Sequence, residues 1–279
     1  MEASDSGEQL PHIRLIVQYD GSCFSGWQLQ PGARTIQGVL EKAIGKVCGG
    51  RPIRLYVAGR TDAGAHARAQ VASFRSPCKR PMRAWVEGLN KLLPDDLAVI
   101  EADEVPANFD PRRWAHSKRY VYRVWNGPTR SPLVCRHAWE VFQPLDLSVM
   151  SKAASLLVGE HDFASFQAAG CAAETTIRVM ERLTVQGRPG AEVLIEAKAS
   201  AFLRYMVRNI AGTLVDVGLH RRDPNGMIEL LSARDRLLAG PTAPAKGLTL
   251  EEVYYEKDPP RRRRMVAGSG TWSAGSVNE

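Results

Sequence analysis

The order of the expected helices and strands predicts an α+β fold made of two halves with the same plan. In residues 12–104 the hydrophobic pattern gives strand, helix, strand, strand, helix and strand, which is the split βαβ order of ferredoxin-like units. Residues 116–257 repeat this order of elements without repeating the residues themselves. We therefore expect one continuous mixed, mainly antiparallel sheet with helices on one face. The cleft between the halves is then a favourable place for a binding site.

The first half is expected to contain two helices and four strands. Its strands show either alternation of apolar and polar residues or short apolar runs bounded by turn residues. Its first helix follows an N-cap at Thr35 and ends at a pair of glycines. The expected elements are, in chain order, a strand at 12–19, a helix at 36–47, strands at 55–58 and 71–74, a helix at about 82–92 and a strand at 97–101.

The second half follows the same rules and adds a short helix before its last strand. Its expected elements are, in chain order, a strand at 118–125, a helix at 147–158, strands at 177–185 and 192–199, helices at 202–217 and 227–238 and a strand at 250–255. Residues 105–115, rich in proline and arginine, form the connector between the halves. We expect residues 1–11 to be a flexible N-terminus and residues 258–279 to be a disordered basic tail.

The composition is that of a basic globular protein. With 279 residues, 44% of them hydrophobic, the chain can bury a large core. The formal charge of +7 belongs to the body of the chain, which favours a polyanionic partner such as nucleic acid. The five cysteines form no C-x-x-C pair, so neither a disulfide framework nor a structural zinc site is expected. We expect no membrane segment and no signal peptide, which fits the cytoplasm.

Residues 59–67 bring charged and titratable side chains together in a short span. The segment reads Gly-Arg-Thr-Asp-Ala-Gly-Ala-His-Ala and lies between two expected strands, so it is a loop. Its glycines and alanines leave room for backbone or ligand to come close. Loops on a rigid scaffold often carry catalytic residues, here Arg60, Asp62 and His66. An ordinary Gly-rich turn, in which Asp62 binds its own backbone amides, is the alternative.

Six parts of the chain together carry a resemblance to a known family. They are Tyr19–Gly21 with Phe24–Gln28, Gly59–His66, Lys118–Tyr122, Gly159–Phe166, Phe202–Ile210 and Gly247–Leu250. In this order and at these separations they resemble the tRNA pseudouridine synthases of the TruA family. The resemblance spans roughly residues 12–256. Ala65 stands where bacterial members usually have a valine, a small change that leaves the chemistry intact.

The resemblance implies an enzyme that isomerises uridine in RNA, so that the base is joined to ribose through carbon instead of nitrogen. It implies no cofactor and no metal. The reaction needs a nucleophile, and the resemblance assigns this role to Asp62, which attacks either the base or the ribose. Arg208 resembles the basic partner that keeps the carboxylate ionised in a desolvated pocket, and it comes from the other half. A solvated helix residue is the alternative for Arg208.

A base stacked inside RNA must be flipped out before such a carboxylate can reach it. The resemblance places Tyr120 where the flipped base would stack. Tyr122 lies two residues further on and points the same way, so it is an alternative, as is a core position for Tyr120. Arg60 resembles the residue that fills or braces the space left by the flipped nucleotide.

Basic residues are expected along the RNA path, where phosphate contacts hold the RNA without reading its sequence. The RNA-binding candidates are Arg68, His66, Arg204, Lys118 and Arg119. A metal site at His66 is not expected, because one histidine beside one aspartate offers too few ligands.

The sequence therefore predicts a cytoplasmic tRNA pseudouridine synthase with an RNA-binding cleft. The resemblance implies uridines 38, 39 and 40 of the anticodon stem-loop as targets, and a homodimer in which one tRNA touches both subunits. A synthase acting on other tRNA positions or other RNAs is the nearest alternative. A non-catalytic RNA-binding protein is a further one, against which Asp62 argues, because a pure binder has no use for a carboxylate facing phosphates.

Overall fold

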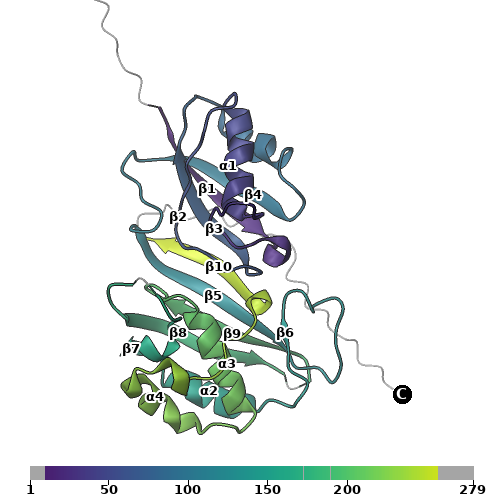
Figure 1. Ribbon diagram of the computed structural model, residues 1–279, viewed down its shortest axis with the longest axis vertical. Coiled ribbons are helices and arrows are strands. Elements are labelled where there is room, and N and C mark those ends of the chain that lie inside the picture. The colour runs from purple at the N-terminus through teal and green to yellow at the C-terminus, as the bar shows by residue number, and fades with distance from the viewer. Residues whose placement is uncertain (1–9, 172, 189, 257–279) are drawn as a thin grey trace, which may run out of the picture.

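The structure, a computed structural model, describes residues 10–171, 173–188 and 190–256 (Figure 1). The expected basic tail and all but the last two residues of the expected flexible N-terminus lie outside this part of the chain. No helix of the described residues is both long enough and apolar enough to cross a membrane.

The first half contains the strands and helices that the hydrophobic pattern predicts. Thr35 caps the first helix, and its hydroxyl accepts a hydrogen bond from the Gly38 N–H. The elements are β1 (His12–Tyr19), the short 3-10 helix η1 (Gly21–Cys23), α1 (Ile36–Val47), β2 (Tyr56–Val57), β3 (His66–Arg75), the π-helical turn η2 (Ala84–Gly88) and β4 (Leu97–Val105).

The described part of the second half contains six strands and three α-helices. Its main elements are β5 (Ala115–Trp125), β6 (Trp139–Glu140), α2 (Leu147–Ser155), β7 (Gly159–Asp162), β8 (Ile177–Gly187), β9 (Glu192–Ala199), α3 (Met206–Gly218), α4 (Met227–Ala233) and β10 (Leu248–Tyr255). Short 3-10 helices link them at η3 (Ala164–Phe166), η4 (Pro224–Gly226), η5 (Arg236–Leu238) and η6 (Ala245–Gly247).

One continuous sheet runs through both halves. The strand order is β4-β1-β3-β10-β5-β9-β8-β7, with β2 also paired to β3 and β6 to β5. The last strand of the chain, β10, therefore lies between the two halves, and Figure 1 shows it in yellow at the middle of the sheet. It pairs antiparallel with β5 along its length, but parallel with β3 only at Thr249 and Leu250, opposite His66 and Ala67. The expected α+β fold with a mixed, mainly antiparallel sheet is confirmed.

Several boundaries differ from the expected ones. β3 begins at His66 instead of residue 71, because residues between these positions also pair with neighbouring strands: Ala67 and Gln70 with β1, and His66 and Ala67 with β10. α3 begins at Met206 instead of residue 202, because Tyr205 has a φ of 65°, which a right-handed helix excludes. The pattern did not predict β6 and β7, which are two and four residues long.

α3 is buried along most of its length, and this burial fixes the position of its first turn. Its side chains Ile210, Leu214 and Val217 are at most 1% exposed. Gly212 lies directly against a neighbouring segment, since a Cβ at this position would lie 1.8 Å from the carbonyl oxygen of Pro241. Only glycine allows this approach without movement of the backbone.

We expect Gly212→Ala to lower the free energy of unfolding by about 2–3 kcal/mol, because the added methyl group must push two backbones apart. Gly226→Ala is the matched control, because its Cβ would meet no atom within 4 Å. Thermal or urea unfolding of both variants measures the difference. Equal stability of the two variants would show that α3 can shift at no cost.

Candidate active site

The loop that carries Asp62 joins β2 to β3 and is held by backbone hydrogen bonds on two sides. The Ala65 N–H donates to the Asp62 carbonyl oxygen (3.1 Å) and closes a turn, in which Gly64 has a φ of 80°. The Trp27 N–H donates to the Thr61 carbonyl oxygen (3.1 Å), and the Gly64 N–H donates to that of Phe24 (3.3 Å). The segment after β1 therefore forms a support for the loop.

Two glycines make this support possible. A Cβ at Gly26, which has a φ of 83°, would lie 2.9 Å from the Thr61 carbonyl oxygen. A Cβ at Gly21 would lie 1.9 Å from the Ala65 carbonyl oxygen. The two segments are thus in backbone contact, which explains why both appear together in the sequence resemblance.

Buried polar side chains of β1 and β3 hold the loop through hydrogen bonds. The Tyr19 hydroxyl lies 2.8 Å from Thr61 Oγ1, and Gln70 Nε2 donates to the Gly59 carbonyl oxygen at 2.7 Å. Gln70 Nε2 also donates to the Tyr19 hydroxyl at 3.4 Å. Burial raises the pKa of Tyr19 to about 12, so its hydroxyl stays protonated. The residues on both sides of Arg60 and Asp62 are therefore fixed by the sheet.

Asp62 pairs with Arg208, which lies 146 residues further along the chain. Arg208 Nη1 donates to Asp62 Oδ2 at 2.8 Å, and the two side chains are 14% and 26% exposed, respectively. Arg208 Nε donates to the Ala243 carbonyl oxygen at 2.8 Å, and the guanidinium carbon lies 4.6 Å from the centroid of the Tyr205 ring. The guanidinium is therefore oriented by three separate contacts.

Tyr120 lies beside the loop, on the same face of β5 as Tyr122. Its side chain is 7% exposed and meets Phe202 edge to face, with ring centroids 5.0 Å apart. Burial raises the pKa of Tyr120, and the charge of Asp62 contributes to the rise. Tyr122 is fully buried and donates from its hydroxyl to the Pro244 carbonyl oxygen at 2.7 Å. Tyr120 also lies against the loop, since a Cβ at Gly59 would be 3.7 Å from its hydroxyl.

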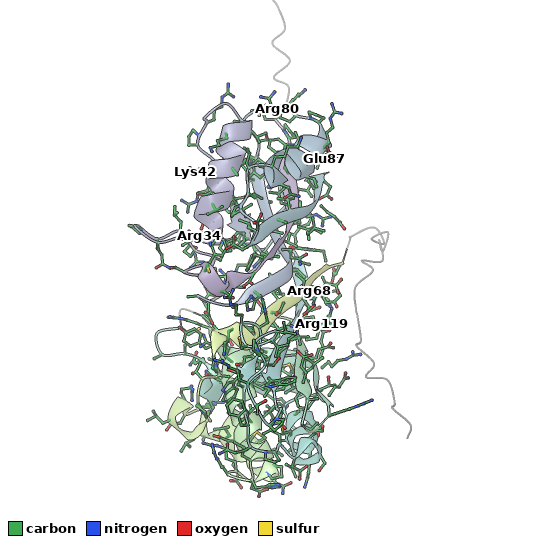
Figure 2. All side chains as sticks on the ribbon, turned by 90° about the vertical axis from the view of Figure 1, so that its right-hand side faces the viewer. Arg34, Lys42, Arg68, Arg80, Glu87 and Arg119 are labelled. Carbon is green, nitrogen blue, oxygen red and sulfur yellow. The ribbon has the colours of Figure 1, made fainter. Side chains whose placement is uncertain are left out.

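The remaining basic candidates differ in their partners. Arg60 is exposed, and no hydrogen bond of its side chain occurs within the described residues. Arg204 is also exposed and lies over the Tyr205 ring, 4.9 Å from its centroid. Arg68 pairs with Glu251 at 3.2 Å, and Arg119 pairs with Glu196 at 3.2 Å. Figure 2 shows these last two arginines on the side of the sheet away from α1.

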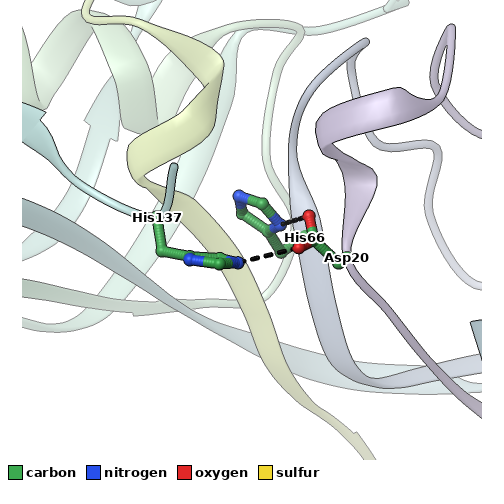
Figure 3. Close-up of side chains that lie close together, drawn as sticks. All are labelled: Asp20, His66 and His137. Atoms are coloured by element: carbon green, nitrogen blue, oxygen red, sulfur yellow. Dashed lines mark hydrogen bonds and ion pairs between the residues drawn. The ribbon is translucent and has the colours of Figure 1, made fainter. Parts of the chain in front are cut away.

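His66 belongs to a cluster with Asp20 and His137 (Figure 3). Their ligand atoms lie within 4.8 Å of one another. Asp20 Oδ2 lies 2.9 Å from His137 Nε2, and Asp20 Oδ1 lies 3.1 Å from His66 Nδ1. His137 comes from the segment between β5 and β6, so sequence spacing gave no sign of this third group.

The hydrogen bonds of His66 identify its neutral form. Its Nδ1 accepts from the Gly21 N–H at 3.1 Å, and its Nε2 lies 3.0 Å from the Lys246 carbonyl oxygen. The nearby Asp20 carboxylate would favour a proton on Nδ1, but a protonated Nδ1 could not accept from Gly21. Burial lowers the pKa of His66, which agrees with the neutral ring. Because both ring nitrogens serve the backbone, we assign His66 to holding β3 against η1 and η6.

Some contributors to the site were not anticipated. Tyr205, Tyr19 and Gln70 orient Arg208 or the loop, and His137 completes the cluster. Tyr19 and Tyr205 lie inside segments that carried the resemblance, which is a sign that could have drawn attention to them. Gln70 and His137 gave no local sign, because their partners are far away in sequence.

Comparison with known proteins adds independent findings. Residues 15–112 and 153–256 match the family described as tRNA pseudouridine synthase. A tRNA pseudouridine synthase A of Myxococcus xanthus is 50% identical over 253 residues, which cover 91% of this chain and 95% of that protein. The protein of the same name from Geotalea uraniireducens (strain Rf4) is 46% identical over 243 residues, 87% of this chain and 99% of that protein.

Among solved structures, one chain in the crystal structure of the archaeal box H/ACA sRNP Nop10-Cbf5 complex is similar. The match covers 72% of this chain and 53% of the chain in that structure. The TM-score is 0.32 and the identity 10%, which is too low to contribute to an assignment.

We expect Tyr19→Phe to lower the free energy of unfolding by about 1–3 kcal/mol, because it leaves the buried Thr61 hydroxyl without its partner. Tyr56→Phe is the control, since Tyr56 is 57% exposed, and it should change stability by less than about 0.5 kcal/mol. Urea unfolding measures both variants. The same small effect in both would mean that the hydroxyl of Tyr19 does not hold the loop.

Proposed function

The chain belongs to the tRNA pseudouridine synthase family, and from this we propose that it converts uridine to pseudouridine at positions 38, 39 and 40 of the tRNA anticodon stem-loop. As a member of the family it is a pseudouridine synthase, an isomerase that acts without removing or adding atoms. The ion pair between Asp62 and Arg208 carries the proposal, because it brings together the two side chains that the sequence resemblance assigned to catalysis.

We propose that Asp62 is the nucleophile. A carboxylate can form a covalent adduct while the base is detached from ribose, turned and rejoined. The bond from C1′ of the ribose to N1 of the base breaks and a bond from C1′ to C5 forms. C5 loses its proton to solvent, and N1 takes up a proton from solvent, so the product is an isomer of uridine. Arg208 supports this role, since a cation at 2.8 Å favours the ionised carboxylate in a partly desolvated site.

Tyr120 and Arg60 are proposed to receive the RNA around the flipped uridine. Tyr120 supports this role by its place against Gly59 of the loop, where an aromatic ring could stack on the detached base. Arg60 is exposed two residues before Asp62, so its guanidinium is free to enter the space that the flipped nucleotide leaves. Both roles depend on RNA being bound.

The RNA path is proposed to follow the exposed basic residues near the loop. Arg204 presents an exposed guanidinium beside Arg208, while Arg68 would have to exchange Glu251 for a phosphate. Arg119 would have to leave its acidic partners in the same way, and His66 would act by holding the loop. A homodimer and a cytoplasmic location remain parts of this proposal.

We expect the protein to release tritium from tRNA labelled at C5 of uridine, and Asp62→Asn to lower the rate by at least about 1000-fold. The asparagine keeps the size of the side chain and a hydrogen-bond acceptor for Arg208, but it lacks the nucleophilic carboxylate. Asp95→Asn, which changes an exposed aspartate, is the control and should release label normally.

Three outcomes of this experiment have different meanings. No release from any tRNA by the unchanged protein would overturn the synthase proposal in favour of a binding protein. Loss of both release and tRNA binding in Asp62→Asn would make Asp62 a structural residue. Pseudouridine mapped outside positions 38–40 would reject the anticodon target and leave the reaction intact.

Tyr120→Leu is expected to lower the turnover number about tenfold or more while tRNA affinity changes little, because stacking of one base contributes about 1–3 kcal/mol. Single-turnover tritium release and tRNA binding measure the two quantities separately. Tyr122→Phe keeps the buried ring and should retain turnover. Unchanged turnover in Tyr120→Leu would instead move the stacking role to Tyr122.

A further inference from the structure

Lys118 is a buried lysine without an acidic partner. Its side chain lies on β5, two residues before Tyr120 and on the same face of the sheet, and the residue is 9% exposed. No hydrogen bond or ion pair of its ammonium group occurs within the described residues. Lysine is almost never buried in this way unless it is paired. The part of the chain that the structure describes therefore holds a buried cation to which it offers no hydrogen bond or ion pair.

A second cation with no acidic partner among the described residues lies on the same face. Lys118 is opposite Ala199 of β9, and Ala199 is opposite Met180 of β8, so the three residues form one row across the sheet. Arg178 lies two residues before Met180 and thus on the same side. Its Nε is buried and has no hydrogen-bond partner within residues 10–171, 173–188 and 190–256, while its Nη1 donates to the Ile177 carbonyl oxygen.

Arg112, in the connector between the halves, adds a third positive charge. Its backbone N–H donates to Asp110 Oδ1. Its side chain is exposed, and its guanidinium makes no hydrogen bond or ion pair in the part of the chain described. Tyr255 donates from its hydroxyl to the Pro111 carbonyl oxygen at 2.7 Å and fixes the connector here.

The charges of this cluster act on one another. Burial, followed by the positive charges of Arg112 and Arg178, lowers the pKa of Lys118 to about 8. At neutral pH the ammonium group still carries its proton. Lys118 and the Nε of Arg178 are thus buried with no carboxylate partner among the described residues, while the exposed Arg112 adds positive charge. This arrangement is unfavourable until an anion enters.

The cluster lies next to the catalytic loop. A Cβ placed on Gly59 would be 3.6 Å from Lys118 Cε and 3.7 Å from the Tyr120 hydroxyl. Gly59 directly precedes Arg60, so an anion bound by Lys118 would lie close to the nucleotide that Tyr120 and Arg60 receive.

We propose that Lys118, Arg178 and Arg112 form a binding subsite for one backbone phosphate of the RNA, adjacent to the uridine that enters the site. The ammonium group and the free Nε–H of Arg178 donate to its oxygens, and Arg112 adds charge from the connector. This inference rests on the proposed function, because it takes the anion from the same RNA. Holding the backbone on one side of the flipped nucleotide offsets part of the cost of unstacking its base.

The test is a double-mutant cycle between protein and RNA. Anticodon stem-loop RNAs carry a neutral methylphosphonate at one phosphate at a time around the target uridine, and Asp62→Asn keeps the RNA unreacted during binding. With Lys118 present, neutralising one phosphate should weaken binding about tenfold. In the protein that also carries Lys118→Met, neutralising the same phosphate should not weaken binding any further. The salt dependence of RNA binding by this variant should be smaller by about one phosphate contact.

Lys198→Met is the matched control. It is the same substitution on the neighbouring strand, but Lys198 faces the other side of the sheet and is paired with Glu181. This variant should keep the full tenfold effect of the neutral phosphate. Equal losses at every phosphate in Lys118→Met, or the same behaviour in both variants, would overturn the subsite.

A stability measurement separates this role from a structural one. Lys118→Met removes an unpaired buried charge, so its melting temperature should rise by roughly a few degrees. A fall would show that the lysine supports the fold instead, and would also overturn the proposal. Tritium release by the unchanged protein is measured in parallel: release without coupling rejects only the subsite, whereas no release from any tRNA rejects the proposed function.

Discussion

The ion pair between Asp62 and Arg208 is the interaction on which the rest of the structure depends. A carboxylate and a guanidinium that are both mostly buried attract each other strongly only if both are held in place, because each loses hydration on burial. The fold supplies this restraint from two directions. Gln70 and Tyr19 fix the residues around Asp62, while Ala243 and Tyr205 orient Arg208. Breaking either support would leave the pair with the cost of burial and less of its attraction.

The continuous sheet explains how residues so far apart in sequence reach this geometry. β10 returns to the middle of the molecule and joins β3 to β5, so the strand that begins after the loop and the strand that carries Tyr120 are fixed relative to each other. His66 adds a hydrogen bond to the segment just before β10. The glycines at 21 and 26 allow the first loop to approach closely enough to complete the support.

The basic side chains near the site fall into two groups with different physical meaning. Arg68 and Arg119 have carboxylate partners, so their charge is largely satisfied within the protein. Lys118 and the Nε of Arg178 have none in the described residues, although both are buried. Net charge alone does not separate these groups. Because the cations of the second group are buried without a carboxylate partner among the described residues, binding an anionic ligand would give them favourable interactions that those residues do not supply. This is the basis of the proposed phosphate subsite.

The sequence alone determined the α+β class, the position of most strands and helices, and the family, because each is expressed in local patterns or in segments that match along the chain. It also placed Asp62 in a loop between two strands. Only the tertiary structure decided that Arg208 reaches Asp62 and that Lys118 is buried with no acidic partner among the described residues. It also decided that Tyr120 lies against the loop at Gly59, whereas the Tyr122 hydroxyl binds Pro244. Tyr120 and Tyr122 are two residues apart in β5 and point to the same face, so no sequence pattern in the strand distinguishes their roles. The difference comes from what packs against each ring, and those contacts join residues that are distant in sequence.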